Sequence, residues 1–106
     1  MKAQPIRIRA RLRERVTEVQ ILMPHPMETG LRVDEAGQLV PRHHITEVNV
    51  TLGARTVCAA RLSFAMSRDP LLVFRFDGAE VGQRLRVTWT DNRGEQRSDE
   101  AVIAAA

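Results

Sequence analysis

The sequence is poor in residues on which several common functions depend. Its 106 residues include one cysteine, one tryptophan, three phenylalanines and no tyrosine. A single cysteine excludes an internal disulfide and a multi-cysteine zinc site. So few aromatic rings offer little surface on which bases could stack, and no apolar run approaches the roughly 20 residues of a membrane-spanning helix. We therefore expect neither a nucleic-acid partner nor a membrane segment.

Lysine is also nearly absent, because Lys2 is the only lysine among the 16 basic residues. The formal net charge of +3 indicates a mildly basic surface and leaves room for an anionic ligand or an acidic partner. A chain of this length predicts one domain, residues 1–106. Residues 1–13 contain no apolar core of about seven residues, so on their own they predict no secretory signal and a cytoplasmic location.

Apolar and polar residues alternate along most of the chain. In residues 6–13 apolar side chains alternate with four arginines, which predicts a strand with one buried and one charged face. A two-residue turn at 14–15 would pair this strand with residues 16–23 and place Ala10 opposite Val19. Both faces agree with this register and favour a β-hairpin, although the turn lacks the glycine that such turns prefer.

The same alternation predicts further strands at residues 47–52, 56–66, 72–76, 84–89 and 96–103, with a tail at 104–106. Two short arms, 31–34 and 38–41, flank a turn at 35–37. Seven or eight short strands spaced about 10 residues apart, without a convincing helix, are typical of a sandwich. We predict an all-β fold, an immunoglobulin-like β-sandwich of seven or eight antiparallel strands.

The loop after the second predicted strand has an unusual composition, namely His25, Pro26, Met27, Glu28, Thr29 and Gly30. Together with His43 and His44, its histidine could bind zinc or copper. The spacing matches no strict ligand pattern. We favour a rigid turn in which His25 and Glu28 bond to backbone groups, with no metal, cofactor or catalytic residue, and keep a metal-binding sandwich as the alternative.

Cys58 shares its parity with Ala60, Leu62 and Phe64 in a predicted strand. This position favours a small buried core residue. The alternative is a disulfide to another chain, which requires an oxidising compartment.

Several apolar residues occupy the outward parity of their strands: Leu22, Ile45, Leu71 and Val73. A lone monomer rarely exposes many such side chains together. Either a β-bulge turns some of them inward or they form a partner interface. Residues 71–74 are apolar on both faces, as expected for a strand between two layers. The arginines at 7, 9, 11 and 13 predict a solvated face that protects an edge, or a patch for an acidic partner.

Three segments give the chain a resemblance to the SoxZ family: the loop at 25–30, the run Ser67, Arg68, Asp69 and Pro70, and the run Trp89, Thr90, Asp91, Asn92, Arg93 and Gly94. The resemblance covers nearly the whole chain. It implies an immunoglobulin-like subunit without catalytic residues that pairs with SoxY in the SoxYZ carrier of bacterial thiosulfate oxidation. SoxY carries the sulfur substrate on a cysteine near its flexible C-terminus.

The resemblance also implies a periplasmic location, reached by export with the signal-bearing partner, where Cys58 is free to form an inter-subunit disulfide. We expect a heterodimer that also engages other sulfur-oxidation enzymes, and an isolated chain that can self-associate. The predicted partner contacts are Leu22, Ile45, Leu71, Val73 and Phe74, with the loop 25–30 as a second contact region.

Overall fold

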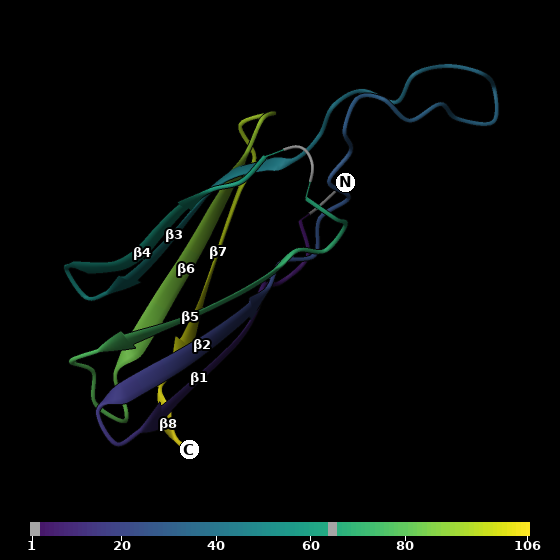
Figure 1. Ribbon diagram of the computed structural model, residues 1–106. Coiled ribbons are helices and arrows are strands. Elements are labelled where there is room, and N and C mark those ends of the chain that lie inside the picture. Colours follow the sequence, from purple (N-terminus) through teal and green to yellow (C-terminus); the bar gives the residue numbers. More distant parts are fainter. Residues whose placement is uncertain (1–2, 64–65) are drawn as a thin grey trace.

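Two four-stranded sheets pack face to face in the computed structural model, which describes residues 3–63 and 66–106 (Figure 1). The strands are β1 (Arg7–Arg13), β2 (Val16–Leu22), β3 (Ile45–Leu52), β4 (Arg55–Arg61), β5 (Leu71–Asp77), β6 (Arg84–Asp91), β7 (Gln96–Val102) and β8 (Ala104–Ala105). Within the described ranges no helix has the length and hydrophobicity to cross a membrane. The prediction of an all-β, immunoglobulin-like sandwich is confirmed.

The first sheet has the strand order β5-β2-β1-β8. Its β1–β2 hairpin has the predicted register, with Ala10 opposite Val19. Glu14 occupies the turn with a φ of 59°, a left-handed conformation that glycine would adopt more readily. The predicted tail is instead the short strand β8, which pairs with β1 in parallel and so departs from the otherwise antiparallel arrangement.

The second sheet has the order β4-β3-β6-β7 with antiparallel pairs throughout. Its edge strand β4 ends at Arg61 and is shorter than predicted, and Phe64 lies outside the described residues. The two predicted arms meet at a bridge between Val33 and Leu39 and extend well away from the sandwich (Figure 1). At the base of this arm, Gly30 has a φ of 85°, and a Cβ there would lie 3.3 Å from the Cβ of Arg42.

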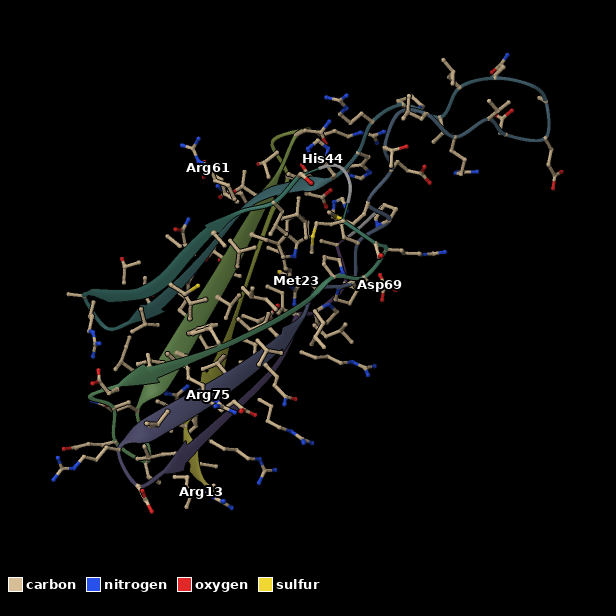
Figure 2. The ribbon with its side chains drawn as sticks, viewed as in Figure 1. Arg13, Met23, His44, Arg61, Asp69 and Arg75 are labelled. Atoms are coloured by element: carbon tan, nitrogen blue, oxygen red, sulfur yellow. The ribbon has the colours of Figure 1, made fainter. Side chains whose placement is uncertain are left out.

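Inward-facing residues of both sheets form the core, as the alternation predicted. Fully buried members are Val19, Ile21, Met23, Ile45, Val48, Val50, Leu85, Val87, Trp89 and Ile103. Met23 lies between the sheets in Figure 2, where the side chains of both layers meet.

Ile45 is one of these core residues, so the prediction that it faces outward is wrong. The pairing of β3 with β6 shifts register between Ile45 and Glu47. A β-bulge adds one residue and reverses the parity of what precedes it. Ile45 therefore faces the core although it shares a parity with the exposed Glu47.

The outward residues of β5 remain exposed, 58% for Leu71 and 50% for Val73. This exposure shows that β5 is not covered on both faces, so the prediction of a strand between two layers is wrong. Within the described residues β5 pairs with β2 alone and is an edge strand. Its neighbour Leu22 is half-buried. Phe74 has the opposite parity and is also half-buried, because it packs against the core from the inner face of β5.

Candidate functional site

The three segments that carry the family resemblance meet at one end of the sandwich. The backbone N–H of His25 donates to Oδ1 of Asp69 at 2.9 Å, and the N–H of Asp69 donates to the carbonyl of His25 at 3.0 Å. The ring of His25 reaches the third segment, with Nε2 3.2 Å from Oδ2 of Asp91. One histidine therefore joins all three segments.

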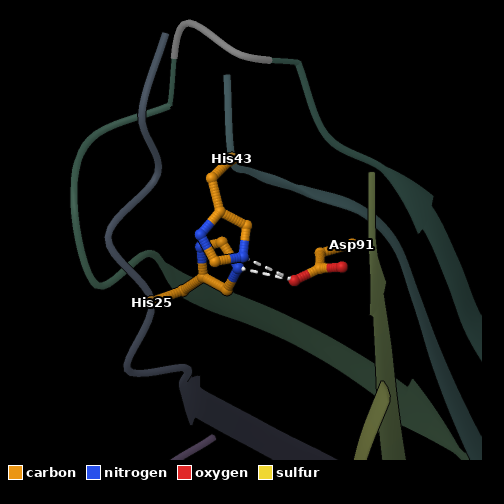
Figure 3. A group of neighbouring side chains, drawn as sticks. All are labelled: His25, His43 and Asp91. Carbon is orange, nitrogen blue, oxygen red and sulfur yellow. Dashed lines mark hydrogen bonds and ion pairs between the residues drawn. The ribbon is translucent and has the colours of Figure 1, made fainter. Parts of the chain in front are cut away.

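His43 comes to the same place because its backbone pairs with that of Glu28 in an isolated antiparallel bridge. Its Nε2 lies 2.8 Å from Oδ2 of Asp91. The rings of His25 and His43 are 4.5 Å apart and meet edge to face. Figure 3 shows both imidazoles converging on this one carboxylate oxygen.

Asp91 accepts hydrogen bonds at both oxygens although it is only 3% exposed. Its Oδ1 accepts from the backbone N–H groups of Arg93 at 3.0 Å and Glu95 at 2.9 Å. Burial by itself raises the pKa of Asp91, but the hydrogen bonds from the two histidines and the two backbone groups outweigh it and place the pKa below its usual value. Asp91 is therefore a buried, ionised carboxylate whose hydrogen-bonding capacity is satisfied.

The tautomer of His25 follows from its other nitrogen. Nδ1 accepts the backbone N–H of Met27 at 3.1 Å, so the ring proton is on Nε2, which donates to Asp91. Burial lowers the pKa of His25 and outweighs the opposing effect of the Asp91 carboxylate. A second proton on Nδ1 would also face the N–H of Met27. His25 is therefore neutral at pH 7.

A metal could be bound here by His25, His43 and Asp91, whose ligand atoms lie within 4.8 Å of one another. The hypothesis from the sequence named His44, which is not in this group, and did not include Asp91. Binding through Nε2 would require the proton of His25 to move to Nδ1, where it would oppose the N–H of Met27. The geometry thus favours a hydrogen-bonded cluster.

This agrees with the rigid turn predicted for the loop, with one difference. His25 does bond to a backbone group, but the carboxylate of Glu28 binds the guanidinium of Arg32, with contacts of 2.8 to 3.1 Å, rather than the backbone. Met27 has a φ of 50° and is 4% exposed, so the turn is fixed partly by burial of its side chain. The loop follows β2 of the first sheet and, through His25, contacts Asp91 at the end of β6 in the second sheet.

A cleft of about 600 Å³ lies beside the cluster. His25, His43 and Trp89 form part of its wall, and Leu22 lines it from the end of β2. Arg7 belongs both to this wall and to the outer face of β1. The cleft is therefore continuous with the outer surface of the first sheet.

Cys58 in β4 packs against the core but is only half-buried, so it is more exposed than the core interpretation predicted. Burial raises the pKa of its thiol, which lowers the fraction of reactive thiolate at neutral pH. The inter-subunit disulfide stays a prediction.

The family model for "Sulphur oxidation protein SoxZ" matches residues 6–102. The chain belongs to the SoxZ family. This SoxZ protein is accordingly a subunit of the sulfur-oxidation system that acts in thiosulfate oxidation, and it has a partner within the Sox complex. No curated protein sequence matches the chain.

Among solved structures, this chain is similar to a superoxide reductase in the oxidised state, with 12% identity and a TM-score of 0.66 over 96% of this chain and 89% of that one. The neelaredoxin from Ignicoccus hospitalis is 13% identical, with a TM-score of 0.61 over 98% and 82%. The neelaredoxin from Archaeoglobus fulgidus is 21% identical, with a TM-score of 0.58 over 94% and 87%. At these identities the likeness concerns the fold alone.

Proposed function

We propose that this SoxZ protein is the non-catalytic subunit of a SoxYZ carrier. It pairs with SoxY, supports the covalent carrier arm of that partner and presents the complex to other sulfur-oxidation enzymes. The family membership supports this function. It is also supported by the cluster of His25, His43 and Asp91, whose titratable groups are hydrogen-bonded to one another. The proposal includes a periplasmic location, reached together with the signal-bearing partner.

The pairing with SoxY is supported by the exposed apolar face and the exposed edge of β5. Leu71 and Val73 are exposed on its outer face. No strand of residues 3–63 and 66–106 pairs with its second edge, which can offer its backbone groups to a neighbouring strand. Leu22 stands directly opposite Leu71 on β2 and extends the apolar patch. Apolar patches on edge strands are typical of partner interfaces. We therefore assign the main SoxY contact to β5 and Leu22, with Phe74 contributing from the core side.

The loop 25–30 is proposed as the second contact region. His25 and Met27 are buried, so their side chains support the loop from inside. Pro26 is exposed, and Glu28 and Thr29 are half-buried, which leaves these three to meet a partner.

Co-expression with the candidate SoxY, followed by size-exclusion chromatography, tests the pairing directly. A 1:1 complex is expected. Intact mass measured with and without reductant then decides whether Cys58 bonds covalently to the partner. A chain that elutes alone beside its partner would contradict the proposed function.

The interface assignment is tested by Leu71→Asp, which places a charge in the apolar patch. We expect heterodimer affinity to fall by about tenfold or more, the usual loss at a buried interface anchor. Val81→Asp is the matched control, because Val81 is 57% exposed but lies in the turn between β5 and β6. Equal affinities of the two variants would refute the placement without affecting the pairing itself.

A further inference from the structure

The outer face of the first sheet concentrates positive charge. Its outward side chains form four cross-strand rows: Arg7, Leu22 and Leu71; Arg9, Gln20 and Val73; Arg11, Glu18 and Arg75; Arg13, Val16 and Asp77. Five arginines against two carboxylates leave a net charge of +3 on this face. The whole chain has the same formal net charge. The residues outside this face therefore carry equal numbers of positive and negative formal charges.

Both carboxylates of this face are occupied by arginines outside β1. Glu18 stands opposite Arg11 but accepts from Arg75, at 3.0 and 2.9 Å. Asp77 lies 3.9 Å from the guanidinium of Arg55. Across residues 3–63 and 66–106, the four arginines of β1 form no ion pair. All four are exposed.

The spacing of this arginine row matches an extended polypeptide. Alternate residues of a strand recur about every 7 Å, so a partner segment with carboxylates at alternate positions meets four guanidinium groups in step. Arginine binds carboxylates through two parallel hydrogen bonds. The rows contain no aromatic side chain, because Phe74 and Phe76 face the core side of β5. The stacking contacts typical of single-stranded nucleic-acid sites are thus missing.

The row leads into the cleft beside the histidine cluster. Arg7 begins the row and lines the cleft, which also receives Arg68 and Arg93 against Asp69 and Glu95. Three arginines thus line the cleft against two carboxylates, while the buried Asp91 behind the wall is engaged by His25 and His43. The cleft has room for the end of a polypeptide segment.

We propose that the arginine row of β1 (Arg7, Arg9, Arg11 and Arg13) binds an extended acidic segment of a partner protein, one end of which enters the cleft beside His25. This surface adjoins the proposed SoxY contact, because Arg7 stands opposite Leu22 on β2. The inference goes beyond the proposed pairing with SoxY and does not depend on it, because it is tested on the isolated chain.

The probe is a fluorescently labelled, capped heptapeptide with glutamate at alternate positions. Its binding to the protein is measured by fluorescence anisotropy. A peptide with glutamine in place of glutamate is its control. We expect saturable binding to the acidic peptide alone, weakening as salt rises from about 20 to about 200 mM because exposed ion pairs are screened. The double variant Arg9→Gln/Arg11→Gln should lower affinity by about tenfold or more.

Arg84→Gln/Arg86→Gln is the matched pair, with the same spacing on the exposed side of β6 in the other sheet. It removes equal charge and should change affinity by less than about twofold. Circular dichroism melts confirm that both variants fold. Equal losses in the two pairs, or no binding by the unmodified protein, would overturn the inference. Tighter, row-dependent binding of a short DNA duplex or of phosphatidylserine vesicles would overturn the assigned class of partner.

Discussion

Asp91→Asn preserves the size of the buried side chain but removes the charge on which four hydrogen bonds converge. The asparagine oxygen can still accept from the backbone of Arg93 and Glu95. Its amide group would face the Nε2–H groups of His25 and His43, which are both donors. Hydrogen bonds to a charged group contribute about 1.5–3 kcal/mol each, so the loss of two should cost about 3–6 kcal/mol.

That loss is a large share of the roughly 5–15 kcal/mol by which a domain of this size is stable. Urea unfolding measures it through the fluorescence of Trp89, whose ring lies 5.2 Å from that of His25. The midpoint should fall at an unchanged slope, since the surface exposed on unfolding is the same. Asp77→Asn serves as the control and should change stability by less than about 0.5 kcal/mol, because its side chain is 84% exposed.

Two results would refute the hydrogen-bond account of the cluster. One is a cost of Asp91→Asn no larger than that of Asp77→Asn. The other is a drop in the urea midpoint of the unmodified protein on adding a chelator, which a metal bound by His25, His43 and Asp91 would produce and hydrogen bonds would not.

Three further outcomes follow from single buried groups. Because burial lowers the pKa of His25, the His25 side chain binds a proton more readily in the unfolded chain than in the folded one. The contribution of His25 to the free energy of unfolding is therefore fully present above about pH 6.5 and is lost as the pH falls below it. A urea midpoint that stays constant between about pH 7.5 and 5 would contradict this. Thr17→Val should stabilise the protein by about 1 kcal/mol in the same assay, because the Thr17 hydroxyl is fully buried and has no hydrogen-bond partner among the described residues. A loss of stability would show that the hydroxyl does have a partner. The Cys58 thiol, whose pKa is raised by burial, should react with a disulfide reagent more slowly than free cysteine and become fast in urea, whereas fast reaction in the folded chain would argue against its packing.

Local alternation made most of the strands predictable. The hairpin register could be read from the sequence because both of its faces agree on one pairing. The same rule failed at Ile45, since a one-residue bulge reverses parity and depends on the partner strand. It also missed β8, which is too short to show any period and exists through its pairing with β1.

The candidate site was predictable only in part. The composition of the loop 25–30 drew attention to His25, and the run of two histidines to His43. Asp91 stabilises the turn after β6 through its bonds to the backbone of Arg93 and Glu95. Nothing in its neighbourhood indicated that its other oxygen would receive two histidines from 48 and 66 residues away.

The sequence by itself determined the fold class, the hairpin, the arginine row and the family, because each depends on the order of neighbouring residues. The tertiary structure decided which apolar residues are exposed, which carboxylate joins the histidines, and that the carboxylates nearest the arginine row are bound elsewhere. These depend on how distant strands and loops meet. Burial and hydrogen-bond partners are set by such contacts, and no local pattern encodes them.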